Sequence, residues 1–434
     1  MDQLLKSGTT LVTKSGQNCI VNKLLGSGGQ GEVYEVEISG KKYALKWYYK
    51  NQATDAQRGI IENLVQKGSP NSRFLWPLDI VGSQNNETFG YIMHLRPKEY
   101  KSIVDMMARR AEPTFKALCT AGINLVDSFL QLHSKGLCYR DISFGNVFVN
   151  PDNGNILICD NDNVDVTGAD CGGVIGTPRF MAPEIVRGEA NPSTETDLFS
   201  LSTLLFYMFM LHHPLEGKIE SEIKCFDSPA MKKVYGDEPI FIWDPVNTSN
   251  RPVVGYQDNA LIYWGIYPNF IKDLFTRAFT EGLNNTQKRV LEIEWRKAFV
   301  KLRDSIIYCG NCGAEVFYDA AKLKSGQIHI CWGCNNGVKI PPRIKIGQSI
   351  VMLNADTKIY THHIKDNLDF NTIVGEVTQH PNNPSLWGIK NVSNELWNIT
   401  KADGNVNTVE PGRSVSLAIG TKINFGTAEG EIRL

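Results

Sequence analysis

The sequence lacks a long hydrophobic run, an apolar start and an excess of charge of one sign. Its most apolar run, residues 198–211, is about 14 residues long, which is too short to span a bilayer and is typical of a buried helix. Residues 1–11 contain no apolar core, so we expect no secretory signal. The 45 Lys and Arg residues against 46 Asp and Glu residues leave a net charge of −1, which excludes a global basic field for nucleic acid or a membrane surface.

Cysteines are few, and most of them are scattered. The sequence has 10, of which four form two close pairs near the C-terminus. The other six are spaced like free thiols in a reducing cytosol, so we expect a cytoplasmic protein; they are Cys19, Cys119, Cys138, Cys159, Cys171 and Cys225. The length of 434 residues predicts about two to four domains, and a charged fraction of 21% with 42% hydrophobic residues indicates an ordinary soluble globular protein.

The stretch from Tyr139 to Asn146 is the one around which the other motifs are arranged. Two apolar runs separated by a Pro-Asp-Asn-Gly turn follow it over residues 147–158, which predicts a hairpin of two short buried strands. We expect this hairpin to bring Asp141, Asn146 and Asp160 together. One carboxylate can then accept a hydroxyl proton, while the amide and the other acid can hold Mg²⁺ against phosphate oxygens.

A glycine-rich stretch and the strand after it form a second motif. The stretch reads G-x-G-x-x-G-x-V and is made of Gly26, Ser27, Gly28, Gly29, Gln30, Gly31 and Val33. Glycines let the backbone approach phosphate oxygens, to which the amides donate. In a Rossmann fold such a turn opens a helix, but residues 32–38 alternate like a strand. A flexible hairpin is the alternative to a phosphate-binding one, and the strand over 43–46, with Ala44 and Lys46, favours phosphate binding.

These motifs resemble the signatures of protein kinases, in the right order over roughly residues 15–305. The family's HRD, the Asn five residues after its Asp and the DFG correspond here to Tyr139-Arg140-Asp141, Asn146 and Asp160-Asn161-Asp162. The resemblance implies an α+β, bilobal kinase fold that uses ATP with Mg²⁺ or Mn²⁺. It further implies that Asp141 is the catalytic base, that Lys46 pairs with the α/β-phosphates, and that Asn146 and Asp160 are the metal ligands.

Two further site residues follow from the resemblance. Residues 53–67 have apolar residues at helical spacing, and Glu62 among them is the candidate for the ion pair with Lys46 that marks an active kinase. The alternative is an ordinary exposed helix glutamate. Residues 90–96 resemble the strand that leads into the hinge, where Met93 either guards the adenine pocket or is a plain core residue.

The segment Gly176–Glu184 closely matches the end of a kinase activation segment, G-T-x-x-x-M-A-P-E. The resemblance implies that Thr177 lines the substrate-docking loop near the catalytic acid. It also implies a structural ion pair between Glu184 and Arg289, and an anchoring role for Asp197 beneath the catalytic loop.

Three departures from the kinase pattern bear on activity. Tyr139 replaces a His whose part is mostly scaffolding, and Ser143 stands where serine/threonine kinases place a Lys that touches the γ-phosphate. Asn161-Asp162 replaces Phe-Gly, so Asp162 either adds a metal ligand or repels nucleotide. An active, autophosphorylating serine/threonine kinase and a nucleotide-binding pseudokinase scaffold are therefore both open interpretations. A small-molecule kinase is a third, against which the peptide-docking segment 176–184 argues.

Arg140 stands next to the catalytic Asp, a position that usually marks regulation by a phosphorylated activation loop. Between Asp160 and Gly176, Thr167 is the one residue that can accept a phosphate, and Asp170 can occupy the basic pocket instead. We therefore expect weak dependence on loop phosphorylation.

The chain is expected to divide into four parts. The kinase N-lobe would span residues 1–97 and the C-lobe residues 98–305, with an irregular Pro-rich insertion at 212–268. A zinc ribbon would span 306–340 and an all-β sandwich 341–434.

The zinc ribbon is predicted from the spacing C-x₂-C-x₁₈-C-x₂-C of Cys309, Cys312, Cys331 and Cys334. Two such pairs are typical of a tetrahedral site, and four ligands leave no open position, so we expect structural Zn²⁺. Unrelated thiols are the alternative; a redox C-x-x-C would need one pair, not two.

Residues 343–434 alternate apolar and polar side chains with frequent turns and show no good helix, which predicts a small β-sandwich. The closing strands resemble those of an FHA domain, a family that binds phosphothreonine. Gly375-Glu376 stands where that family has Gly-Arg, which removes the cation that pairs with phosphate. The module is therefore either FHA-like with lost or altered binding or another sandwich.

The catalytic-loop sequence, the Pro-rich insertion and the C-W-x-C pair together resemble a bacterial kinase group associated with tellurium-resistance-type stress modules. The resemblance implies, besides ATP and a protein substrate, a von Willebrand A-like protein and a PP2C-type phosphatase as partners.

Overall fold

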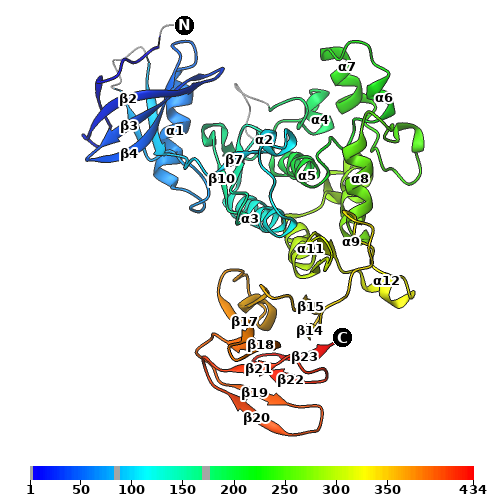
Figure 1. The fold of residues 1–434 in the computed structure, drawn as a ribbon. Helices are drawn as coiled ribbons and strands as arrows, with labels where there is room; N and C mark the ends of the chain where they lie inside the picture. Colours follow the sequence, from blue (N-terminus) through cyan, green and yellow to red (C-terminus); the bar gives the residue numbers. More distant parts are fainter. Residues whose placement is uncertain (1–2, 83–87, 169–175) are drawn as a thin grey trace. The chain divides into compact units, whose positions relative to one another are not determined.

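The computed structural model describes residues 3–82, 88–168 and 176–434. They form two compact units: Met1–Gly265 with Lys272–Arg296, and Ile266–Ile271 with Lys297–Leu434. The boundaries lie inside helices α8 (Asp258–Ile266), α9 (Asn269–Ala278) and α11 (Glu292–Asp304), and both predicted C-terminal modules belong to the second unit (Figure 1).

The first unit begins with a six-stranded antiparallel sheet in the order β1-β2-β3-β4-β6-β5. Its strands are β1 (Thr10–Val12), β2 (Asn18–Ser27), β3 (Gly31–Ile38), β4 (Lys41–Tyr48), β5 (Asp79–Val81) and β6 (Gly90–His94). Side chains at alternate positions, such as Tyr34 and Val36, form an apolar core with Leu45 and Ile92. The predicted strands over residues 19–50 and 90–96 are confirmed.

Helix α1 (Asp55–Lys67) follows this sheet's fourth strand, as predicted for residues 53–67. Thr54 caps it by accepting the N–H of Gln57, which satisfies one of the free amides of the first turn. Ile61 and Leu64 are the buried residues of its apolar face.

The rest of the first unit is mainly helical. Its longer helices are α3 (Phe115–His133), α5 (Thr194–Met210), α8 (Asp258–Ile266), α9 (Asn269–Ala278) and the start of α11, and its short ones are α2 (Ile103–Met107), α4 (Pro183–Val186), α6 (Lys218–Ser221), α7 (Ser228–Lys232) and α10 (Glu281–Asn284). Every residue of α5 from Thr196 onward is buried, so the apolar run in the sequence is a core helix, as predicted. Among the described residues, no helix combines the length and the apolar character needed to cross a membrane.

Two small sheets lie between these helices. One has three strands, β7 (Lys101–Ser102) beside the hairpin of β9 (Val147–Val149) and β10 (Ile156–Ile158), and the other pairs β8 (Leu137–Cys138) with β11 (Asp165–Val166). A Cβ at Gly154, in the turn of the hairpin, would lie 2.1 Å from the carbonyl oxygen of Ala117 in α3, so only glycine fits there.

The prediction that residues 212–268 are irregular is wrong in part. The segment contains α6, α7, a π-helical turn over Lys233–Asp237 and α8. Pro229 lies in the first turn of α7, where the missing N–H of proline costs no hydrogen bond, so proline starts this helix instead of breaking it. Trp243 stacks on Trp264 of α8, with ring centres 5.4 Å apart, and Phe241 packs against Phe206 of α5.

The second unit contains a cysteine-bearing hairpin, β12 (Ile306–Tyr308) and β13 (Glu315–Phe317), and helix α12 (Ala320–Lys324). A small core joins Ile307, Val316 and Val338 to the buried cysteines Cys309 and Cys331.

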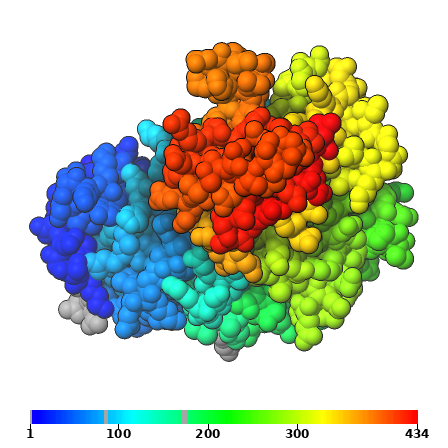
Figure 2. All heavy atoms as spheres, turned by 90° about the horizontal axis from the view of Figure 1, so that it is seen from below, coloured from blue at the N-terminus to red at the C-terminus, as the bar shows by residue number. Residues whose placement is uncertain are grey.

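Residues 343–434 form two antiparallel sheets, as predicted for a sandwich; Figure 2 shows one face of this module in orange to red. One sheet contains β15 (Ser349–Met352), β14 (Arg343–Ile346), β23 (Glu429–Arg433), β22 (Lys422–Asn424), β19 (Trp397–Thr400) and β20 (Val406–Val409), and the other β16 (Lys358–Tyr360), β17 (Ile373–His380), β18 (Asn383–Asn391) and β21 (Ser414–Ser416). Trp397 and Ile389, from the two sheets, share one core. The expectation of no helix is wrong by a single turn, α13 (Thr361–Ile364).

Candidate active site

The β9–β10 hairpin brings the backbones of the two predicted metal-binding residues close together. Antiparallel pairing sets Val147 opposite Ile158. The residues just outside the strands, Asn146 and Cys159, are therefore neighbours, and the N–H of Cys159 donates to the Asn146 carbonyl at 2.8 Å. Asp160 follows directly. The predicted hairpin is confirmed.

Asp141 is held by side chains from both sides. Asn146 Nδ2 donates to the Asp141 backbone carbonyl at 2.7 Å and lies 3.4 Å from its Oδ2. Thr177 Oγ1 donates to Asp141 Oδ1 at 2.7 Å. The carboxylate thus joins the catalytic loop to the segment Gly176–Glu184, and Thr177 lies where the sequence predicted it.

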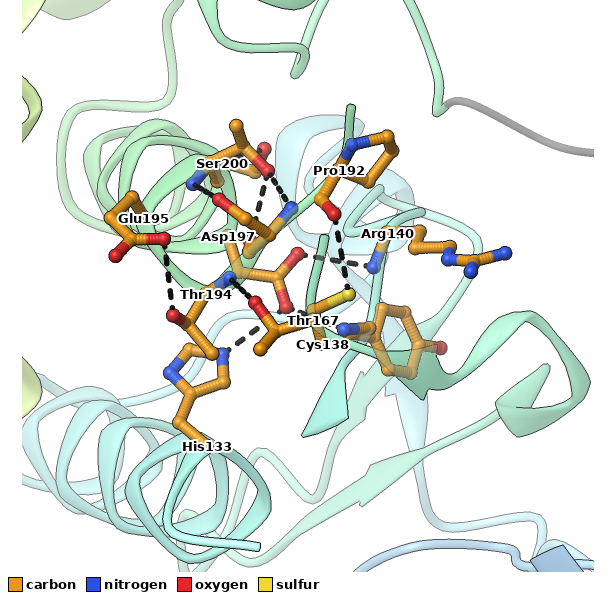
Figure 3. Close-up of polar contacts among 12 residues, drawn as sticks. His133, Cys138, Arg140, Thr167, Pro192, Thr194, Glu195, Asp197 and Ser200 are labelled. Carbon is orange, nitrogen blue, oxygen red and sulfur yellow. Dashed lines mark hydrogen bonds and ion pairs between the residues drawn. The ribbon is translucent and has the colours of Figure 1, made fainter. Parts of the chain in front are cut away.

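Asp197, in the first turn of α5, anchors the catalytic loop (Figure 3). Its Oδ2 accepts the N–H of Tyr139 at 2.5 Å, and its Oδ1 accepts the N–H of Arg140 at 3.0 Å. His133 Nε2 lies 3.1 Å from the same Oδ2. Burial lowers the pKa of His133, but hydrogen bonds with Asp197 and Glu292 outweigh it and raise that pKa to about 9.

Tyr139 and Arg140 connect the catalytic loop to the segment after β10. The Tyr139 hydroxyl donates to the carbonyl of Cys159, which supports the scaffolding part predicted for this position. Arg140 Nη2 lies 2.5 Å from Asp165 Oδ2. Asp165 is thus the acidic partner of Arg140. Asp170, which the sequence suggested for this part, lies outside the described residues.

Lys46, on β4, is buried between the glycine-rich turn and the segment after β10. Its Nζ donates to Gln30 Oε1 at 2.8 Å and to Asp162 Oδ2 at 2.8 Å, and it lies 3.6 Å from Asp160 Oδ1. Burial lowers the pKa of Lys46, but Asp162 and Asp160 together raise it above its ordinary value. Lys46 is therefore held as a cation.

The glycine-rich turn joins β2 to β3, as expected for a hairpin. A Cβ at Gly31 would lie 2.2 Å from the carbonyl oxygen of Trp47, so this position requires glycine. At Gly26, Gly28 and Gly29 a Cβ would meet nothing within 4 Å, which leaves the turn open on that side. The open side is the kind of space that a phosphate group needs.

The strands next to this turn bring the other predicted nucleotide-binding residues into register. Val33 of β3 lies opposite Lys46, and Ala44 lies opposite Met93 of β6. Ala44 and Met93 are both buried. The structure thus places these four residues on neighbouring strands, as their predicted roles require.

The predicted ion pair between Glu62 and Lys46 is wrong for this structure. Glu62 Oε1 instead lies 3.0 Å from Lys14 Nζ, with 35% of the Glu62 side chain exposed. The residue of α1 that reaches the site is Gln57, whose Nε2 donates to the Asp162 carbonyl at 3.1 Å. Five residues rotate a helix by about 140° beyond a full turn, so Gln57 and Glu62 lie on different faces.

The segment that replaces DFG is held in one conformation. Asp160 has a left-handed backbone with φ of 48°, which non-glycine residues adopt mainly at strained functional positions. Asn161 is fully buried, and its Nδ2 donates to the carbonyls of Leu75 at 2.9 Å and Ile158 at 3.0 Å. Asn161 therefore fastens the turn through hydrogen bonds where Phe would fasten it by packing.

The carboxylates of the site fit a divalent cation. Burial raises the pKa of Asp160, with Asp162 and Asp141 adding to the effect and Lys46 opposing it. Asp162 Oδ1 is buried and has no hydrogen-bond partner among the described residues. Carboxylate and amide oxygens are ligands that Mg²⁺ prefers, so Asn146 and Asp160 fit the group that the sequence predicted there.

The end of the activation segment is fixed by the predicted structural ion pair. Arg289 Nη1 lies 2.8 Å from Glu184 Oε1, and 2% of the Arg289 side chain and 14% of the Glu184 side chain are exposed. Arg289 also donates to the carbonyl of Glu195 in α5. The pairing of Glu184 with Arg289 is confirmed.

The four C-terminal cysteines converge as the spacing predicted. The sulfur atoms of Cys309, Cys312, Cys331 and Cys334 all lie within 4.8 Å of one another. The pairs Cys309–Cys334 and Cys312–Cys331 are each separated by 3.6 Å, close to the ~3.8 Å expected for a tetrahedral site with Zn–S bonds of about 2.3 Å. Backbone N–H donors lower the pKa of Cys309 and lower that of Cys334 to about 6, whereas at Cys312 such a donor is outweighed by the neighbouring thiols, which raise the pKa. The donor set fits zinc.

Asp304, His362 and His363 form a second cluster whose ligand atoms lie within 4.8 Å of one another. His363 Nδ1 accepts the N–H of Tyr360 at 2.9 Å, so the proton of the neutral ring is on Nε2, which donates to Asp304 Oδ2 at 3.0 Å. That nitrogen has no lone pair for a metal. The cluster is therefore a buried hydrogen-bonded joint between α11 and α13.

Sequence reasoning missed three side chains of the site: Tyr48, Gln57 and Asp165. Tyr48 donates to Asp162 Oδ2 at 2.5 Å, Gln57 donates to the Asp162 carbonyl, and Asp165 pairs with Arg140. The one signal in the sequence for these contacts is Asp162, which stands where the kinase pattern has glycine. A charged side chain that is buried there requires polar partners.

Comparison with known proteins agrees with this geometry. The sequence model described as protein kinase domain matches residues 19–254. Similar proteins include the probable serine/threonine-protein kinase CCRP1 of Zea mays, 26% identical over 204 residues (45% of this chain, 32% of the relative), and serine/threonine-protein kinase pkn2 of Myxococcus xanthus, 26% identical over 208 residues (45% and 24%). Protein kinase C delta type of Mus musculus is 29% identical over 219 residues (48% and 31%). The chain thus spans about a third or less of the length of these relatives. Because the kinase-domain match covers more than half of its residues, the chain belongs to the protein kinase domain family.

Proposed function

We propose that this chain is an ATP- and Mg²⁺-dependent protein kinase that transfers a phosphoryl group to serine or threonine hydroxyls. The observation that carries the proposal is the convergence of Lys46, Asp141, Asn146 and Asp160 in one site. The bond between Thr177 and Asp141 joins this site to the docking segment. The relatives that are described as serine/threonine kinases support the class of acceptor.

Each side chain has a task that follows from its contacts. Asp141 accepts the proton of the substrate hydroxyl as its oxygen bonds to the γ-phosphorus and the bond to ADP breaks. Asn146 and Thr177 hold Asp141 in place for this step. Lys46 fixes the α/β-phosphates as a buried cation. Asn146 and Asp160 would hold Mg²⁺, which neutralises phosphate charge when bound.

The first experiment measures phosphate transfer from labelled ATP, with Mg²⁺ or Mn²⁺, by the wild type, Asp141→Ala and Asp160→Asn side by side. We expect incorporation by the wild type, and at least a hundredfold loss in both variants because each removes a charge on which positioning depends. Mapping labelled residues on the chain itself tests autophosphorylation. Equal incorporation by all three proteins would contradict the proposal.

A pseudokinase scaffold is the second candidate, and Ser143 favours it, because a hydroxyl there supplies no cation to the γ-phosphate. This candidate predicts no incorporation by any variant, while ATP still raises the melting temperature of the wild type. The zinc-bearing hairpin and the β-sandwich would then be the functional centre.

We also infer structural Zn²⁺ at the four cysteines and a place in a bacterial stress-signalling module with a von Willebrand A-like protein and a PP2C-type phosphatase. The sulfur geometry supports the zinc, and the sequence resemblance supports the module. Zinc content of one atom per chain, and co-purification of the chain with the two partners, test these inferences separately.

A further inference from the structure

The acid that pairs with Lys46 comes from the segment after β10. Lys46 is 5% exposed and Asp162 is 1% exposed, and Nζ lies 2.8 Å from Oδ2. A buried ammonium group requires such a partner, because an unpaired charge in the interior is strongly unfavourable. Asp160, at 3.6 Å, is 43% exposed at its side chain. Asp162 is therefore the nearer and the better shielded of the two acids.

Helix α1 has no acid on the face that reaches the site. Gln57 marks this face through its bond to the Asp162 carbonyl and its Nε2–hydroxyl distance of 3.3 Å to Tyr48. The acids of α1 are Asp55 and Glu62. At about 100° per residue they lie about 160° and 140° around the helix from Gln57. Neither can pair with Lys46 without a large rotation of the helix.

Asp162 is held in place by its surroundings. The Tyr48 hydroxyl donates to the same Oδ2 that Lys46 uses, at 2.5 Å. Gln57 holds the backbone of Asp162, and Asn161 fastens the turn to the carbonyl of Leu75. A side chain fixed in this way can orient a flexible lysine.

We propose that Asp162 is the positioning residue of Lys46 and takes the place of the helix glutamate of other kinases. Its consequence for catalysis rests on the proposed function, whereas the pairing itself rests on the geometry above. Because Asp162 stands two positions after Asp160, one short segment sets both a metal ligand and the phosphate-binding lysine. Assembly of the site then needs no acid from α1. Movement of α1 therefore cannot switch the site by making or breaking an ion pair with Lys46.

The test compares three variants with the wild type. Asp162→Asn keeps the shape and removes the charge, and Asp162→Asn/Gln57→Glu returns an acid on the helix face that reaches the site. Glu62→Gln, on the far side of the same helix, is the matched control. The readouts are the Kd of Mg²⁺-ATP, kcat and KM with labelled ATP, and the pKa of Lys46 from NMR of ¹³C-methylated lysines.

We expect Asp162→Asn to reduce kcat/KM about 100-fold, as misplacement of a positioning group does, and to lower the pKa of Lys46. Adding Gln57→Glu should bring kcat/KM back to at least about a tenth of the wild-type value. Glu62→Gln should have the same kcat/KM as the wild type. Rescue from the helix distinguishes positioning from a purely structural role.

The proposal would be overturned if Asp162→Asn kept the nucleotide affinity and the Lys46 pKa of the wild type. It would also be overturned if the double variant had a kcat/KM no higher than that of Asp162→Asn. If the wild type transfers no phosphate, the proposed function fails, while the affinity and the Lys46 pKa still decide the pairing. If Asp162→Asn does not fold, the double variant decides: a folded protein that binds ATP supports the pairing, and an unfolded one contradicts it.

Discussion

Arg140 has its acidic partner within the same chain and without any modification. In kinases with an Arg beside the catalytic Asp, a phosphate on the activation loop normally supplies this partner. Here Asp165 supplies it, 2.5 Å from Nη2, with 6% of the Arg140 side chain exposed. Thr167 points elsewhere: it is exposed, and its Oγ1 accepts the N–H of Thr194 at 3.1 Å (Figure 3).

Asp165→Asn should therefore lower the rate of phosphate transfer, and Thr167→Ala should not. A charge-assisted hydrogen bond contributes on the order of 2 kcal/mol, so we expect a decrease of roughly tenfold or more for Asp165→Asn. Initial rates with labelled ATP measure both. A large loss of rate in Thr167→Ala would show that loop phosphorylation matters after all.

The sequence predicts those contacts of the site whose residues are close together in the chain, and it does not predict those between distant segments. Asp141, Asn146 and Asp160 follow from one hairpin whose register is set by apolar alternation and a Pro-Asp-Asn-Gly turn, so their convergence is predictable. The partner of Lys46 is 116 residues away from it in sequence. Such a pairing is set by how β4 packs on the turn after β10, and no periodicity encodes it. Glu62 is an acid of the predicted helix, but helical rotation places it on another face than Gln57, and it pairs with Lys14.

At the scale of elements, a polar joint fastens α3 to α5 and to the start of α11. His133, the last residue of α3, lies 3.1 Å from Asp197 Oδ2 and also bonds Glu292. All three side chains are nearly buried. The amphipathic pattern predicts each of these helices, but the joint arises from side chains at their ends, where sequence patterns are least informative.

This joint should make the stability of the first unit depend on pH. The pKa of His133 is raised from an ordinary value of 6.5 to about 9, so its stabilisation is complete below pH 6.5 and is lost as the pH rises through 9. A shift of this size corresponds to about 3 kcal/mol. Denaturant-dependent hydrogen exchange of α3 and α5 amides at pH 6.5 and 9.5 measures it.

His133→Gln is the control for this prediction, because it keeps a hydrogen-bonding side chain that does not titrate. The wild type should lose stability between the two pH values relative to this variant. A parallel pH dependence in both proteins would assign the change to other groups.

At the scale of the whole molecule, the four cysteines belong to the second unit, and their effect on stability should follow that division. Cys309 and Cys331 pack in one core with Met352 of β15. A metal at the cysteines would therefore stabilise both the hairpin of β12 and β13 and the edge of the sandwich next to it. Structural zinc contributes on the order of 10 kcal/mol of apparent binding free energy, which is comparable with the whole stability of a domain.

Removal of the metal should thus unfold the cysteine-bearing hairpin and loosen β14 and β15, while the kinase domain stays folded. We expect a strong chelator, or Cys331→Ser, to remove hydrogen-exchange protection from residues 306–353 and to leave that of α3 and α5 within a few-fold of the untreated protein. Cys225→Ser is the matched control, because Cys225 is an exposed thiol of the first unit, outside the cluster. Loss of protection throughout α3 and α5 would instead show that the two units fold as one cooperative body, and unchanged protection at 306–353 would refute a structural metal.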